Sequence, residues 1–181
     1  MPLFFAYGSN MDIGAMARRC PASRAIGRAK LMGFRFIIST DGYATVIRER
    51  GAAVWGIGWD LALADVPPLD RYESLSTGLY SKMVQPVLTD QGARRCLVYI
   101  GRSTRPGPPK PGYAEGVAAA AADAGLPADY LRELMAWVPK APGAATGPFK
   151  DRFSPPPETQ APAVRPLWAA PTSGRNRPVE R

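Results

Sequence analysis

A series of short, strand-like segments between residues 22 and 101 limits the fold more than any other feature of the sequence. Apolar residues alternate along 33–40, where Phe34, Phe36 and Ile38 would share one face of a half-buried strand. Turn signals such as Asp41-Gly42 and Asp90-Gln91-Gly92 separate the segments. Evenly spaced short strands of this kind predict an antiparallel, barrel-like sheet. The predicted strands cover residues 22–30, 33–40, 43–48, 53–61, 79–88 and 94–101.

Helical patterns flank the strands and dominate the last third of the domain. Proline at Pro67-Pro68 fits a fresh helix start over 68–74, because proline is tolerated in a first turn. An alanine-rich run over 113–124 is typical of a helix with Gly125 as its cap, and a further helix is predicted over 126–138. We therefore expect an α+β fold, with a small antiparallel or mixed, barrel-like sheet and flanking helices.

The composition changes at Pro139, which divides the chain into one predicted domain over 1–138 and a tail over 139–181. The tail holds 10 of the 20 prolines and a net charge of +4, from 7 basic and 3 acidic residues. Such a segment, without sustained periodicity, is expected to be mostly irregular. Because it lacks interleaved aromatic residues, its charge is interpreted as solubilising rather than as a nucleic-acid site.

The chain opens with an apolar run over 3–7 that predicts a buried strand. The run stops at Gly8-Ser9-Asn10, which suits a turn, and a short helix over 12–19 follows with Asn10 or Asp12 as its N-cap. A strand, a tight loop and a helix start can point backbone N–H groups at an anion or a developing oxyanion. This loop is therefore a candidate ligand site.

The sequence contains no histidine, which excludes Ser–His–Asp and Cys–His catalysis and histidine-ligated zinc. An acid or base would have to be a carboxylate, Lys, Tyr or Cys. Cys20 and Cys96 form no metal-ligand cluster and are expected to be free thiols. No apolar run reaches membrane-spanning length and no secretory signal pattern is seen, so a cytoplasmic location is expected.

Four segments, in order along the chain, resemble motifs of the γ-glutamylcyclotransferase-like family. Lys110-Pro111 departs from this pattern, because the family often has Ser-Pro there. Asn10 distinguishes the chain from the glutathione-specific branch, which has leucine at this position. The matching segments are FAYGSNM (5–11), VWGIGW (54–59), LDRYESLSTGLY (69–80) and PPKPGY with GLPADYL (108–113 and 125–131).

The resemblance implies a reaction in which the α-amine of a γ-glutamyl group attacks its own γ-carbonyl. The products would be 5-oxoproline and a free amine or amino acid, and no metal or organic cofactor would be needed. Glu73 falls on the position of the family's catalytic acid/base. The other implied site residues, which would bind a small γ-glutamyl substrate, are Tyr7, Gly8, Ser9, Asn10, Tyr80 and Tyr113. We expect a monomer or homodimer without a membrane or nucleic-acid partner.

The residues alone leave alternatives open. Glu73 could be a solvated carboxylate at a helix end, paired with Arg71 or Lys82. Asp70 is the rival carboxylate, to which we assign capping or pairing with Arg71. Tyr113 could pack a helix onto the sheet rather than contact substrate. The alternative for the whole protein is a catalytically inactive binding or regulatory module of the same fold, or, less favoured, a protein that binds nucleic acid or an anionic surface through its tail.

Overall fold

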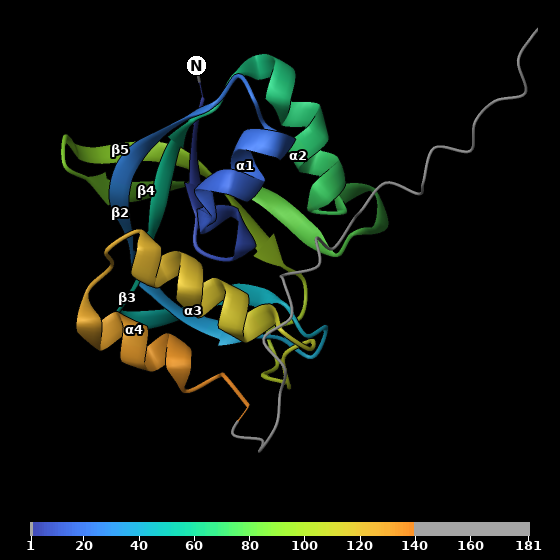
Figure 1. The fold of residues 1–181 in the computed structure, drawn as a ribbon, viewed down its shortest axis with the longest axis vertical. Helices are drawn as coiled ribbons and strands as arrows, with labels where there is room; N and C mark the ends of the chain where they lie inside the picture. The colour runs from blue at the N-terminus through green and yellow to red at the C-terminus, as the bar shows by residue number, and fades with distance from the viewer. Residues whose placement is uncertain (1, 140–181) are drawn as a thin grey trace, which may run out of the picture.

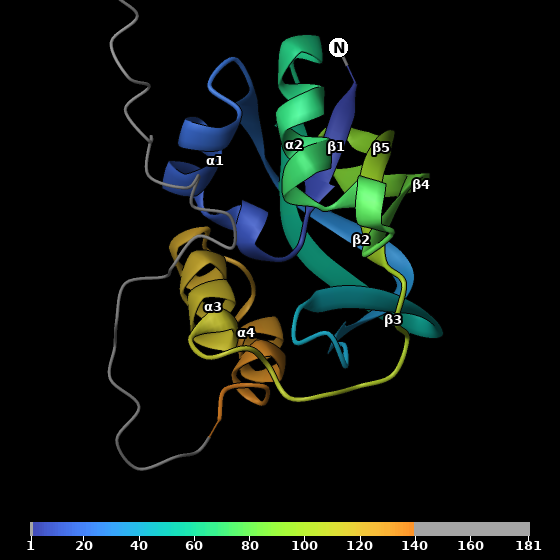
Figure 2. The same cartoon turned by 90° about the vertical axis from the view of Figure 1, so that its right-hand side faces the viewer.

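The computed structural model describes residues 2–139, in which five strands close into a barrel (Figures 1 and 2). The strands are β1 (Leu3–Ala6), β2 (Arg24–Ile38), β3 (Ala44–Asp60), β4 (Tyr80–Thr89) and β5 (Gly92–Gly101). Their order around the barrel is β1-β3-β2-β4-β5. Parallel pairing of β1 with β5 makes the sheet mixed, and every other pairing is antiparallel. The predicted α+β class and barrel-like sheet are confirmed.

Two predicted strand pairs are wrong in detail, because each is one long, bent strand. The segments 22–30 and 33–40 form β2, and the segments 43–48 and 53–61 form β3. The β2–β3 register shifts between Met32 and Phe34. Gly33 and Gly51 have φ of +77° and +82° at this point, where glycine bends the backbone without ending the strand. The predicted breaks are therefore bends in a continuous hairpin.

The helices lie outside the barrel. They are α1 (Ile13–Arg19), α2 (Val66–Tyr72), α3 (Tyr113–Asp123) and α4 (Ala128–Met135), with short 3-10 turns at Ser9–Met11, Leu63–Asp65 and Leu75–Thr77. Figure 2 shows α3 and α4 side by side, with α1 next to α3. Asp12 caps α1 by accepting a 2.9 Å hydrogen bond from the N–H of Ala15, whereas Asn10 lies in the preceding 3-10 turn. None of the helices within 2–139 has the length and apolarity needed to cross a membrane.

The core fills the barrel and extends under the helices. Phe5, Leu31, Ile38 and Val98 are fully buried inside the sheet, and Val117 and Leu134 bring α3 and α4 onto it. Cys20 and Cys96 are buried and free, as expected. The predicted tail over 139–181 lies outside the described residues except for Pro139.

Candidate active site

The loop that follows β1 is buried rather than exposed. Its 3-10 turn contains Ser9 and Asn10, whose relative exposures are only 7% and 4%. Gly8 precedes the turn, where a Cβ atom would stand 3.1 Å from the Tyr113 hydroxyl and 3.3 Å from Ala44 Cβ. A larger residue would therefore force the loop away from β3 and α3. Burial of two polar side chains beside this glycine suits a ligand site more than a solvent-exposed turn.

Glu73 reaches the same place from the end of α2. Its N–H caps the helix at Leu69 O, and Ser74 then turns the chain through the left-handed region at φ 53°. The Glu73 side chain is 7% exposed, and its Oε1 accepts a 2.6 Å hydrogen bond from Asn10 Nδ2. The alternative of a solvated carboxylate is therefore wrong. A buried carboxylate held by an amide donor is a group whose proton affinity the protein controls.

Asp70 has a structural role, although the predicted pairing with Arg71 is wrong. Its carboxylate binds Lys82 Nζ at 2.8 Å and also accepts a hydrogen bond from the Tyr99 hydroxyl. These contacts join α2 to β4 and β5. Because Lys82 is occupied in this way, the two carboxylates of α2 have separate surroundings.

Four tyrosines enclose the space above Glu73: one follows β1, two lie in β4 and β5, and one begins α3. Tyr7 donates a 2.5 Å hydrogen bond to the carbonyl of Tyr99, and Tyr80 donates a 2.6 Å bond to the carbonyl of Ala44. The Tyr113 hydroxyl accepts a 3.2 Å bond from the Ala44 N–H. Tyr113 therefore packs α3 onto the barrel and also lines the pocket.

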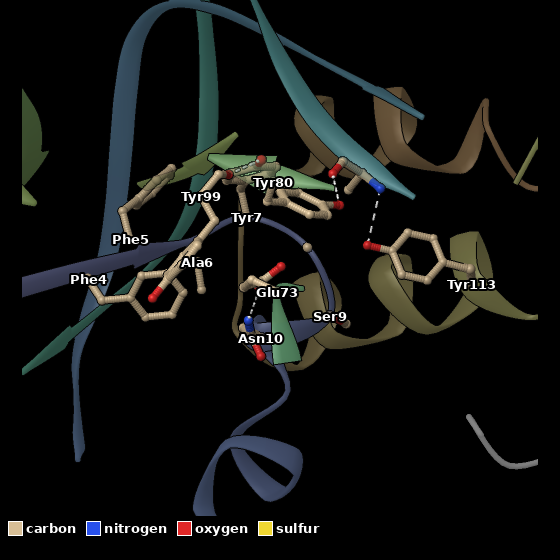
Figure 3. A pocket seen from close by; sticks show the side chains of 12 residues that line it. Phe4, Phe5, Ala6, Tyr7, Ser9, Asn10, Glu73, Tyr80, Tyr99 and Tyr113 are labelled. Atoms are coloured by element: carbon tan, nitrogen blue, oxygen red, sulfur yellow. Dashed lines mark hydrogen bonds between the residues drawn. The ribbon is translucent and has the colours of Figure 1, made fainter. Parts of the chain in front are cut away.

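Figure 3 shows these side chains converging on one pocket with Glu73 at its polar end. All seven residues predicted for the site line it. Sequence reasoning missed Ala44 and Tyr99, and for Tyr99 the one available signal was its place in an apolar strand segment. The pocket residues are Phe4, Phe5, Ala6, Tyr7, Gly8, Ser9, Asn10, Ala44, Glu73, Tyr80, Tyr99 and Tyr113.

The surroundings of Tyr7 and Tyr99 keep these two hydroxyls protonated. Burial, followed by the negative charge of Glu73, raises the pKa of Tyr7 well above its usual value. Burial and the hydrogen bond to Asp70 raise the pKa of Tyr99 in the same direction. Among residues 2–139 no cluster of three acidic, cysteine or histidine side chains could hold a metal ion. The pocket is therefore an uncharged tyrosine cage with one ionisable carboxyl at its end.

Comparisons with known proteins agree with this architecture. Residues 53–134 match the model of the AIG2-like family. The chain is 28% identical over 148 residues to the curated proteins named γ-glutamylcyclotransferase from Homo sapiens and Mus musculus, covering 76% of this chain and 79% of each relative. A solved structure titled γ-glutamyl cyclotransferase has a TM-score of 0.70 and 27% identity, covering 81% of this chain and 91% of the other.

The closed mixed barrel gives this chain the fold of the solved γ-glutamyl cyclotransferase structure. The chain is therefore similar to the AIG2-like family over residues 53–134, and to proteins named γ-glutamylcyclotransferase over most of its length.

Proposed function

We propose that this protein is a γ-glutamylcyclotransferase, which converts a γ-glutamyl amide into 5-oxoproline and a free amine or amino acid. The observation that carries the proposal is the contact between Glu73 and Asn10 inside a buried pocket. It joins the single ionisable carboxyl of the pocket to the loop that the sequence singles out for ligand binding. The names of the curated relatives support the same activity.

Glu73 acts as the base and then as the acid. The substrate enters with its α-amine protonated and unreactive, and the Glu73 carboxylate takes one proton from it. The amine nitrogen then forms a bond to the γ-carbonyl carbon, and the bond from that carbon to the leaving nitrogen breaks. Glu73 returns this proton to the leaving nitrogen, and the second proton that the ring nitrogen must lose passes to the released amine, so that the enzyme ends in its starting form.

The loop binds the charged or developing anionic part of the substrate. Ser9 and Asn10 open a 3-10 turn, where backbone N–H groups have no partner within the turn. These groups can hold the α-carboxylate or the oxyanion that forms during attack. Tyr7, Tyr80 and Tyr113 enclose the glutamyl chain and favour the folded conformer that closes a five-membered ring.

The test is release of 5-oxoproline from a panel of γ-glutamyl amino acids, γ-glutamyl amines and glutathione. Glu73→Gln keeps the shape of the side chain but removes the base, so we expect its turnover to fall about 10²- to 10⁴-fold. Asp70→Asn is the matched control, since it makes the same acid-to-amide change on the same helix. We expect that variant to stay within about tenfold of wild type, because Asp70 acts on the scaffold.

The outcomes separate the candidate functions. Release that is lost in Glu73→Gln and kept in Asp70→Asn supports the proposed enzyme and identifies the leaving amine. A larger loss of turnover in Asp70→Asn than in Glu73→Gln would contradict the proposal, because it would indicate that Asp70 is the base. If no member of the panel is turned over, γ-glutamyl ligands that still bind would indicate an inactive binding module.

A further inference from the structure

The pocket has a charged neighbour on α1 that the sequence did not single out. Arg19 lies in the last turn of that helix, and its Nη1 donates a hydrogen bond to Asn10 Oδ1. The other end of the same amide, Nδ2, donates to Glu73 Oε1 at 2.6 Å. Arg19, Asn10 and Glu73 therefore form one continuous chain of hydrogen bonds from a cation to the proposed base.

The direction of this chain follows from the chemistry of its first member. A guanidinium carries five N–H donors and has no acceptor, so it can face only the oxygen end of the Asn10 amide. The amide must then present its NH₂ end to Glu73. An NH₂ donor stabilises a carboxylate, whereas an amide oxygen in its place would stabilise the protonated acid.

Two further contacts hold Arg19 in place. Its Cζ lies 3.3 Å from the centre of the Tyr72 ring, in a cation–π arrangement. The Tyr72 hydroxyl is 2.8 Å from Ser9 Oγ. One guanidinium therefore supports both polar residues of the loop, directly at Asn10 and through Tyr72 at Ser9.

Building on the proposed function, we propose that Arg19 is a positioning residue that fixes the Asn10 amide and thereby keeps Glu73 in its charged, proton-accepting form. Arg19 is outside the set of residues that line the pocket, and its hydrogen bond to Asn10 connects it to a residue that does line it. Burial by itself favours the neutral acid form of Glu73, and Arg19 offsets this effect.

The Asn10 amide bonds to both Arg19 and Glu73, and tyrosines surround the Glu73 side chain. Tyr7 follows β1, and Tyr99, Tyr80 and Tyr113 come from β5, β4 and α3. Burial raises the pKa values of Tyr7 and Tyr99. Asp70 is the nearest other carboxylate on the element of Glu73, and it is bound to Tyr99 and Lys82. On the Arg19 side, the Met16 sulfur accepts a hydrogen bond from Arg19. The Cys20 thiol also senses the Arg19 charge, but burial and then the charge of Asp65 raise its pKa, so the thiol stays protonated.

The first test is the pH dependence of kcat/KM for 5-oxoproline release, compared between wild type and Arg19→Met. Without the guanidinium, the Asn10 amide can flip and present its oxygen to Glu73, so protonation of Glu73 becomes easier. We expect the acid limb of the profile to move to higher pH by about one unit. Arg18→Met, which removes the same charge from an exposed neighbour on the same helix, should leave the limb in place.

A double-variant comparison shows whether Arg19 acts through Asn10. Asn10→Ala removes the amide, so Arg19→Met should move the acid limb no further in that background. An equal further shift in the double variant would overturn the proposal. A rise in KM alone, with an unmoved limb, would also overturn it, because that result indicates direct binding of substrate by Arg19. Arg19→Gln, which keeps a polar end without fixing its direction, replaces Arg19→Met if that variant does not fold.

A second measurement does not need turnover. The Glu73 carboxyl carbon can be titrated by NMR in ¹³C-glutamate-labelled protein, with its signal assigned from Glu73→Gln. The midpoint should rise by about one pH unit in Arg19→Met and stay unchanged in Arg18→Met. An unchanged midpoint in Arg19→Met overturns the proposal. Wild-type inactivity on the γ-glutamyl panel would instead refute the proposed function, while this titration still decides the role of Arg19.

Discussion

The peptide groups on either side of one alanine shape the ligand side of the pocket. Ala44 receives the Tyr80 hydroxyl proton at its carbonyl and donates its N–H to the Tyr113 hydroxyl. The direction of each tyrosine's hydrogen bond to the peptide backbone is therefore fixed: Tyr80 donates and Tyr113 accepts. The Tyr80 hydrogen is used in its bond to Ala44, whereas the bond from Ala44 to Tyr113 does not use the Tyr113 hydrogen. In the proposed enzyme, both hydroxyls line the space that the glutamyl group would occupy.

We expect Tyr113→Phe to raise the KM for a γ-glutamyl substrate about tenfold and to leave kcat nearly unchanged. The lost hydrogen bond would be present in the bound substrate and in the transition state alike, so binding weakens uniformly. Steady-state kinetics of 5-oxoproline release provide the measurement. Tyr43→Phe is the control, since Tyr43 packs edge-on against Tyr113 at 5.2 Å but does not line the pocket. A fall in kcat without a change in KM would contradict this role.

The site residues that sequence reasoning found are those with a local signature. The Tyr7–Asn10 loop follows an apolar strand, and Glu73 ends a proline-started helix beside a glycine turn. Ala44, Arg19 and Tyr72 have no such signature, because their roles come from contacts across the fold. The Tyr72–Ser9 and Asn10–Glu73 contacts each join residues 63 positions apart. The fold creates these contacts by bringing the Ser9–Met11 turn and the end of α1 beside the end of α2, and no local pattern encodes them.

At the scale of elements, glycine has two uses that the sequence pattern does not distinguish. Gly33 and Gly51 have positive φ and bend the β2–β3 hairpin, whereas Gly56 allows close approach. A Cβ atom on Gly56 would lie 2.0 Å from the carbonyl oxygen of Ala6. The prediction of four short strands failed because Gly33 and Gly51 were each interpreted as a boundary between two strands. Strands and helices without internal glycine bends, such as β4, β5 and α3, were predicted within about two residues.

Gly56→Ala should therefore destabilise the protein by about 3 kcal/mol or more, because the obstructing atom belongs to the backbone of β1 and cannot rotate away. Urea unfolding followed by tryptophan fluorescence measures the loss. Gly58→Ala, two residues along the same strand, would meet the Ile26 side chain at 3.0 Å. Since Ile26 is 39% exposed and can move, the control should cost only about 1 kcal/mol. Equal losses would show that the close approach to β1 does not limit residue 56.

At the scale of the whole molecule, the closed barrel buries groups that ionise only in alkaline solution. Cys20 lies under α1 and Cys96 lies within β5, and both are fully buried. Burial raises the pKa of each thiol to about 11, with a further contribution at Cys20 from the charge of Asp65. The folded protein therefore keeps both protons at a pH where the unfolded chain has released them.

This difference predicts that the free energy of unfolding falls as the pH rises from 9 to 10. A group with a raised pKa stabilises the fold below its unfolded value, here 9.0, and loses that contribution as the pH rises toward its folded value. The expected fall in this window is about 1 kcal/mol for each cysteine. Urea unfolding under reducing conditions at several pH values provides the measurement. The double variant Cys20→Ala/Cys96→Ala should be less stable, but its free energy of unfolding should fall less between pH 9 and 10. An equally steep fall would show that the two thiols do not cause the pH dependence.

The Tyr7–Tyr99 hydrogen bond bears on the order in which the barrel refolds. It joins β1 to β5 across 92 positions, at the seam where the first strand meets the last strand of the barrel. Contacts between such distant parts of a chain form slowly during folding. A refolding chain can thus contain the β2–β3 and β4–β5 hairpins and still lack the pocket. We therefore expect the pocket to be completed late in refolding, so that the delay before ligand binding recovers would report the docking of the first strand.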